Sequence, residues 1–287
     1  MAIQLVRKAM IMKEQQPNEL LSLTNDYVFR RIFGEKNKDS LADFLSAILN
    51  MPIDELADLA VDDPNLHREH KNDKSSKLDV RVHTKSGQII NIEIQVNPEH
   101  SFGERIAYYN ARIYSGQLKK GEIYSKLHRT VSVVITDFVF IQKNEDCLNR
   151  FMWYNIDNGT LLTDAQEINI LELPKLPEND DGTKLWQWLK ILKLRDEDEM
   201  EDIAKDNEAI KNVIVTLREM SADEAEQRLA EARERDERDR ISSYVSGVLD
   251  GEEKAKHEHA RRMKAKGISV NDIADITGLT LEEIEKL

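Results

Sequence analysis

Cysteine is almost missing from this sequence, since Cys147 is the only one in 287 residues. A single thiol excludes an intrachain disulfide and a cysteine-based zinc site. Apolar runs are also short, and none approaches the ~20 residues that a membrane span requires. The first residues lack the apolar core and the small-residue cleavage site of a secretory signal. We therefore expect a cytoplasmic protein without a membrane segment.

Positive charge is in deficit, with 41 Lys and Arg against 54 Asp and Glu and a net charge of −13. This balance argues against a general nucleic-acid coat protein. The deficit is concentrated in residues 191–287, which carry −9 of that charge. Residues 101–130 are locally basic, and as a group they could contact phosphates or could simply form a solvated helix surface. Their basic residues are Arg105, Arg112, Lys119, Lys120, Lys126 and Arg129.

The stretch LTNDYVFRRIFGEKNKDSLADFLSAILNM, residues 23–51, predicts a helix, a turn and a second helix. Thr24 or Asn25 could cap the first helix, because both side chains can accept a backbone hydrogen bond. Gly34 is expected to end that helix and Ser40 to begin the next.

Strands are predicted further along the chain. An edge strand is expected near residues 66–69, and RTVSVVITDFVF, residues 129–140, is typical of a buried strand. Two weaker strands are expected around 150–156 and 167–173. Residues 101–121, ahead of the strand at 129–140, are expected to form an amphipathic helix, with Ser101 as its cap and Gly121 as its end. This order predicts an α/β (α+β) core with a mixed central sheet flanked by helices.

After residue 190 the composition changes to charged helical sequence, so we predict two domains, 1–190 and 191–287. Residues 220–267 predict an extended helix or helix pair, used for self-association or as a mobile connector. Two short helices end the chain, and Thr280-x-x-Glu283 is a capping box. They have the form of half a helix-turn-helix motif, but the second is acidic and would be repelled by phosphate. A packing or dimer role is therefore favoured.

The stretch KLDVRVHTKSGQIINIEIQV, residues 77–96, predicts a β-hairpin. Aliphatic residues alternate with polar ones along both strands, which places the two sets on opposite faces. Gly87 ends the turn and is free to take a positive φ. In the register that this turn favours, Asp79 lies opposite Glu93, with Gln95 one pleat further on.

Two facing carboxylates normally destabilise a strand pair because they repel each other. A divalent cation bound between them makes the arrangement favourable. Mg²⁺ prefers oxygen ligands and is commonly bound by one or two carboxylates plus a substrate phosphate. Asp79 and Glu93 would supply the carboxylates, and the backbone carbonyl of Ile94 could add a neutral ligand. Such a site supports phosphodiester hydrolysis. The alternative is that both carboxylates merely face solvent beside Lys77 and Arg81.

An Asp, a short turn and then Glu-x-Lys on the next strand, with a helix before and after, is the PD-(D/E)XK nuclease arrangement. Gln95 stands here in place of the lysine, and a glutamine can orient water but cannot exchange a proton. Four segments in order resemble the Rpn family of recombination-promoting nucleases, a transposase family of the PD-(D/E)XK type in which Glu-x-Gln is the usual form. They are LTNDYVFRRIFG, LDVRVHTKSGQIINIEIQV, RIAYYNARIYSGQLKKGEIYSKL and VSVVITDF.

The resemblance implies a restriction-endonuclease-like core and a DNA endonuclease whose breaks promote recombination. It implies Mg²⁺, or Mn²⁺ or Ca²⁺, held by Asp79 and Glu93, with Gln95 as the third catalytic residue. Asp26 on the first helix matches the family's motif and could reach the metal through water, or could be a helix-start acid. DNA contacts are expected from part of the basic group, namely Arg105, Arg112, Lys119 and Lys120.

Two other functions remain open at this point. The missing lysine could leave a nuclease fold that binds DNA or regulates without turnover. Alternatively, the protein could be an interaction component in which the C-terminal helices form a homodimer.

Overall fold

The computed structural model describes residues 19–57, 59–62, 80–99 and 101–287. The chain divides into two compact units, one ending at Glu234 and one formed by Arg235–Leu287. They are described separately. None of the described helices combines the length and apolar character needed to cross a membrane.

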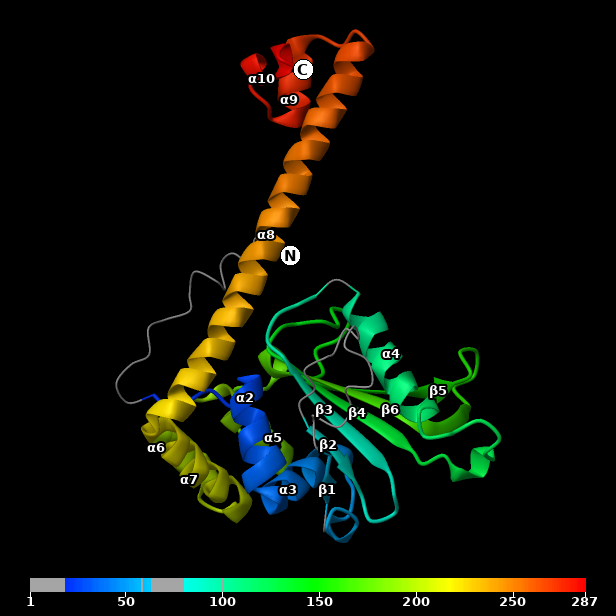
Figure 1. Cartoon of the computed structure of the whole chain (residues 1–287), viewed down its shortest axis with the longest axis vertical. Coiled ribbons are helices and arrows are strands. Elements are labelled where there is room, and N and C mark those ends of the chain that lie inside the picture. Colours follow the sequence, from blue (N-terminus) through cyan, green and yellow to red (C-terminus); the bar gives the residue numbers. More distant parts are fainter. Residues whose placement is uncertain (1–18, 58, 63–79, 100) are drawn as a thin grey trace. The chain divides into compact units, whose positions relative to one another are not determined.

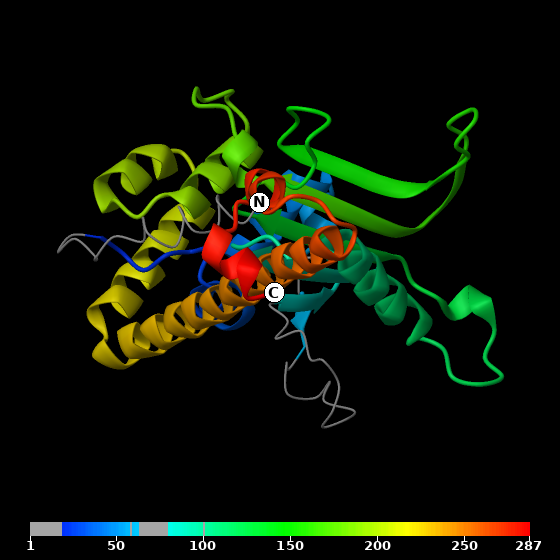
Figure 2. The same cartoon turned by 90° about the horizontal axis from the view of Figure 1, so that it is seen from above.

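A mixed six-stranded sheet forms the centre of the first unit, in the order β1-β2-β3-β4-β6-β5 (Figure 1). The outer pairs are antiparallel, whereas β3, β4 and β6 run parallel. Figure 2 shows β5 and β6 as a long antiparallel pair. The predicted mixed sheet is confirmed. Its strands are β1 (Ala60–Val61), β2 (Val80–His83), β3 (Ile89–Gln95), β4 (Thr130–Thr136), β5 (Leu148–Tyr154) and β6 (Leu161–Glu172).

The predicted hairpin is formed by β2 and β3, with Val80 paired to Ile92 and His83 paired to Ile89. Gly87 closes the turn with a φ of +86°, which a residue with a side chain rarely adopts. A Cβ at this glycine would also lie 2.7 Å from the ring of His128. Asp79 and the edge strand expected at residues 66–69 lie outside the described residues.

The first predicted helix begins as expected, because the Asn25 side chain accepts hydrogen bonds from the Tyr27 and Val28 N–H groups. The prediction that Gly34 ends it and Ser40 begins the next was wrong. Gly34 does not take the positive φ that ends helices, so the chain continues in a wider π-helical turn. The elements are α2 (Asp26–Phe29), the π-helix η1 (Arg30–Lys36) and α3 (Lys38–Leu49).

These helices cover one side of the sheet with the main hydrophobic core (Figure 1). Phe29, Phe33 and Phe44 pack against one another at ring-centroid distances of 4.6 to 6.3 Å. Trp188 of α5 (Lys184–Lys193) closes the cluster, with its ring centroid 5.4 Å from that of Phe44. Aliphatic side chains of β3 and β4 complete this core.

The other side of the sheet is covered by α4 (Phe102–Ser115), which packs through Phe102 and Ile106 onto Val134 and Ile170. The helix was expected to end at Gly121 but already ends before Gly116, whose N–H bonds back to Arg112. Short 3₁₀ turns occur at η2 (Ile53–Glu55), η3 (Tyr124–Lys126) and η4 (Leu173–Lys175).

The main core extends beyond the boundary predicted at residue 190. Both α6 (Glu197–Ala204) and α7 (Glu208–Ala222) contribute buried residues to it, among them Val213 and Leu217. The first turns of α8 (Glu224–Ala265) then meet α2, since Asn25 donates to the Ala230 carbonyl at 3.1 Å. Position 190 therefore falls within the compact unit, because the helices after it complete the core.

The second unit contains the rest of α8, a single 42-residue helix, together with α9 (Val270–Thr277) and α10 (Leu281–Glu285). The predicted extended helix and the two short helices are thus confirmed. Thr280 and Glu283 exchange the reciprocal hydrogen bonds of a capping box, as the sequence predicted. Ile273 and Ile284 are the centre of a small apolar cluster that holds these helices together.

Candidate active site

The polar residues of β3 form a buried layer and do not face solvent. Every residue of β3 is buried. Glu93 pairs in register with Val134, which packs under α4, so Asn91, Glu93 and Gln95 lie on the α4 side of the sheet. The alternation predicted from the sequence is correct, but the polar side is covered by a helix.

Arg105 of α4 contacts side-chain oxygen atoms of this layer. Its Nη2 donates to Glu93 Oε1 at 2.7 Å and to Gln95 Oε1 at 3.0 Å. Its Nη1 lies 3.3 Å from Oε2 of Glu99. Three side-chain oxygens from different residues therefore surround one positive charge.

The orientation of Gln95 is fixed from its other end. Its Nε2 donates to the Asn97 carbonyl at 2.9 Å and to Glu99 Oε1 at 3.3 Å. With the amide nitrogen engaged in this way, the amide oxygen points toward Arg105. Glu99 was not predicted, because it follows the end of β3 and lies outside the alternating pattern.

Burial dominates the electrostatics of Glu93, whose side chain is only 8% exposed. Loss of hydration raises the pKa of its carboxyl group, the positive charge of Arg105 opposes that shift, and Glu99 adds to it. The net direction is upward. Keeping this carboxylate ionised therefore costs free energy. Shifted pKa values of this kind are common at functional sites.

Asp26 makes only a local contact. Its Oδ1 accepts the Tyr27 N–H at 2.7 Å, and the capping bonds of α2 come from Asn25. Within the described part of the chain, no hydrogen bond or ion pair joins Asp26 to Glu93. Its catalytic role stays a prediction.

Of the four residues predicted to contact DNA, Arg105 contacts Glu93 and Glu99 of the carboxylate site. Arg112 is exposed on α4, and Lys119 and Lys120 are exposed in the turn after it. Arg105 therefore pairs with carboxylates here, and solvent can reach the side chains of the other three.

Arg81 of β2 was not predicted as a site residue. It pairs with Asn91 in the strand ladder, so its side chain belongs to the same side of the sheet as Glu93. Burial lowers the pKa of its guanidinium, Asp62 opposes this shift, and the charge of Arg112 lowers the pKa further. Its Nε is buried without a hydrogen-bond partner. The shared strand face of Asp79 and Arg81 was the sequence signal for this placement.

The donors in this layer fit a hard divalent cation. Carboxylate and amide oxygens are its preferred ligands, and Glu93, Gln95 and Glu99 already direct such oxygens at one positive charge. Among the described residues, no group of three or more His, Cys, Asp or Glu is placed to hold a metal ion. Asp79, the second predicted carboxylate ligand, is outside them.

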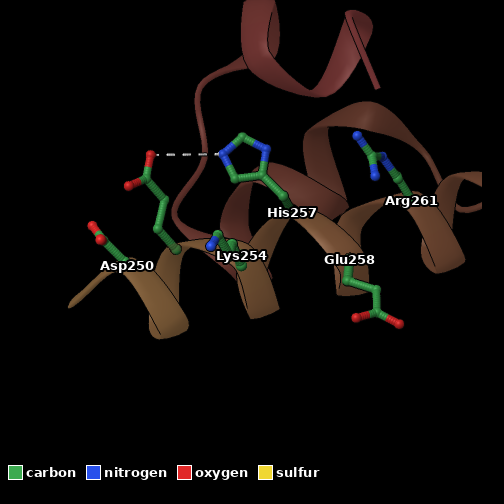
Figure 3. Close-up of a pocket in the computed structure, with 6 residues that line it drawn as sticks. Asp250, Lys254, His257, Glu258 and Arg261 are labelled. Carbon is green, nitrogen blue, oxygen red and sulfur yellow. Dashed lines mark ion pairs between the residues drawn. The ribbon is translucent and has the colours of Figure 1, made fainter. Parts of the chain in front are cut away.

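A separate cavity of about 680 Å³ lies in the second unit, along one face of α8 (Figure 3). His257 and Glu253 are 4.0 Å apart on successive turns. Acidic and basic side chains are mixed along this face, so it favours no ligand of one charge. Its lining residues are Asp250, Glu253, Lys254, His257, Glu258 and Arg261.

Comparison with known families identifies the family of the chain. The sequence pattern of a family described as PD-(D/E)XK nuclease family transposase matches residues 23–246. The chain belongs to this family. The match includes the whole sheet and its helices, and it confirms the resemblance to PD-(D/E)XK transposases of the Rpn type. Comparisons with curated proteins and with solved structures found no match.

Membership in the PD-(D/E)XK nuclease family transposases gives a general reaction class for the chain. Such nucleases hydrolyse phosphodiester bonds and generally use divalent metal ions. The mixed sheet flanked by helices is consistent with the fold of this family. Glu93 and Gln95 stand within the matched region, on the strand that follows the hairpin turn.

Proposed function

We propose that this protein is a Mg²⁺-dependent DNA endonuclease whose breaks promote recombination. The observation that carries the proposal is the convergence of Glu93 and Gln95 oxygens on a single positive charge in a buried layer. Family membership supports the reaction class, and the sequence resemblance supports DNA as the substrate.

In this proposal Asp79, Glu93 and the Ile94 carbonyl hold the metal. When bound, Mg²⁺ would polarise the scissile phosphate and lower the pKa of a bound water. Mn²⁺ has similar ligand preferences and would substitute for it, and Ca²⁺ would occupy the same oxygen ligands.

The chain's own residues would position the reactants. The buried Glu93 carboxylate is held by Arg105, so its negative charge is fixed at one place on β3. Gln95 directs its amide oxygen into the same space and can accept a hydrogen bond from the attacking water. Because an amide does not take up a proton at neutral pH, Gln95 would orient this water and the proton would leave to solvent or to the phosphate. Asp26 would add a contact through water.

A plasmid cleavage assay tests the proposal. Purified protein, supercoiled DNA and Mg²⁺ or Mn²⁺ should give nicked or linear DNA. Asp79→Ala, Glu93→Gln and added EDTA should each abolish cleavage, because each removes a ligand or the ion. Glu104→Gln is a matched control, since Glu104 is an exposed residue of α4, and it should cleave as the natural protein does.

Absence of cleavage with every metal, in a folded protein, would contradict the proposal. Gln95 in the lysine position gives a specific reason to keep a second candidate, a nuclease fold that binds DNA without turnover. That candidate requires DNA binding that survives Asp79→Ala. Self-association through the C-terminal helices is a separate proposal, which the molar mass in solution tests directly.

A further inference from the structure

Arg81 is a basic residue on the α4 side of the sheet, and the proposed function gives it no role. Arg81 stands on β2 opposite Asn91, two residues before Glu93 along β3. Side chains two residues apart on a strand share one face, so Arg81 is a near neighbour of the site on that face. It is half-buried, and its Nε donates to no described group.

The surroundings of Arg81 compensate its charge only in part. Asn91, its ladder partner, is neutral. Arg112 adds a second positive charge nearby. Among the residues that the structure describes, the acid that opposes this charge is Asp62, whose carboxylate also lies 3.0 Å from Nε2 of His83. Among the described residues, no ion pair or side-chain hydrogen bond is made by Arg81.

A half-buried cation without a partner of its own destabilises a fold unless an anion joins it. The planar guanidinium of arginine matches the geometry of phosphate oxygens and binds them with two parallel hydrogen bonds. Arg112 is exposed, so an anion from solvent can reach this end of the layer. Arg105 differs from Arg81, because it already contacts Glu93 and Glu99.

We infer that Arg81, assisted by Arg112, is a binding residue for a phosphate of the nucleic-acid backbone beside the carboxylate site. The inference rests on the proposed function for the identity of the anion. Arg81 thus positions the strand, and it takes no part in proton transfer.

DNA binding in EDTA tests this without cleavage. Fluorescence anisotropy of a short labelled duplex gives the Kd over a series of salt concentrations. Arg81→Met should weaken binding roughly five- to ten-fold near physiological salt and reduce the salt slope by ~0.9, the loss of one phosphate contact. Arg81→Lys keeps the charge and should restore the slope. Arg228→Met is the matched control, since Arg228 is 77% exposed and pairs with Glu224, and it should leave both unchanged.

Thermal melting separates binding from a structural role. Arg81→Met should melt at or above the temperature of the natural protein, because it removes a half-buried cation whose Nε has no hydrogen-bond partner among the described residues. A lower melting temperature with unchanged DNA affinity would overturn the inference, and so would an unchanged salt slope or absence of DNA binding by the natural protein. If Arg81→Met does not fold, Arg112→Met and Arg81→Lys decide by the same two measurements. Weakened binding in a protein that never cleaves would refute the endonuclease and leave the phosphate contact standing.

Discussion

The two sides of strand β3 are both buried but are built from different residues. On the α3 side, Ile90, Ile92 and Ile94 of β3 join the aromatic cluster around Phe44. On the α4 side, the same strand carries Asn91, Glu93 and Gln95 into a layer of hydrogen bonds. One strand thus supplies both an apolar core and a polar site.

This difference separates stability from chemistry. Burial of apolar surface stabilises a fold by roughly 25 cal/mol per Å², whereas burial of polar or charged groups costs free energy unless they are paired. The α3 side therefore provides the stability that allows the α4 side to keep one buried carboxylate and two partly buried arginines. Substitutions on the two sides should have effects of different kind and sign.

The largest loss of stability is expected on the α3 side. Phe44→Ala should lower the free energy of unfolding by about 3–5 kcal/mol, because it leaves a cavity among Phe29, Phe33 and Trp188. Urea unfolding measures the change. Tyr108→Ala is the control, since Tyr108 is 59% exposed on α4, and it should stay within about 0.5 kcal/mol. Equal losses in both variants would contradict the comparison.

Arg105→Met should lower the free energy of unfolding by about 1–3 kcal/mol, which is less than for Phe44→Ala. The substitution leaves the buried Glu93 carboxylate without its cation. Adding Glu93→Gln to Arg105→Met should recover part of that loss. The double-mutant cycle, measured by urea unfolding in EDTA, gives the coupling free energy of the pair. A coupling of zero would mean that the pair contributes nothing to the stability of the layer.

Glu93→Gln alone should stabilise the folded protein slightly, in contrast to the two preceding substitutions. The folded-state pKa of Glu93 is raised above the unfolded value. Stability is therefore unaffected by this group below the unfolded pKa and falls as the pH rises through the folded pKa. Glu93→Gln lacks this loss, so its Tm should match that of the natural protein near pH 4 and exceed it near pH 8. Melting scans in EDTA check the trend, and a lower Tm for Glu93→Gln at the higher pH would refute it.

The smallest effect concerns Cys147, which packs against the apolar core. Burial raises the pKa of its thiol to about 11. Because the thiolate is the reactive form, a disulfide reagent near pH 8 should modify the folded protein slowly. The urea-unfolded chain is the control and should react at once. Rapid modification of the native protein would show that this edge of the core is open.

Elements with local signals were predicted well from the sequence. The hairpin followed from alternation and Gly87, and the last helix followed from its Thr280 capping box. Each depends on residues close together in the chain. The end of the first helix was wrong because Gly34 keeps a right-handed backbone in η1, a choice that tertiary packing makes.

The site was only partly predictable for the same reason. Alternation gave the shared face of Glu93 and Gln95, but not that α4 covers it. The contact of Arg105 with Glu99, and the burial of the Arg81 Nε without a hydrogen-bond partner among the described residues, arise only when α4 and the hairpin come together. The boundary at residue 190 was predicted from a change to charged composition. The charged residues of α7 lie on its solvent side, whereas its apolar residues pack into the main core.

The contact between α2 and the start of α8 has a consequence for biosynthesis. Asn25 and Ala230 are 205 positions apart, and Tyr27 bonds to Glu226 across 199. A nascent chain emerges from the ribosome with its N-terminus first. Contacts between residues this distant in sequence therefore form late and slowly. A nascent chain that has emerged only as far as β6 already contains Glu93 and Gln95 but lacks α5 to α7 and the helix start that hold α2. Completion of the first unit therefore requires translation through at least Ala230, so a product that terminates before α7 lacks helices that complete the main core.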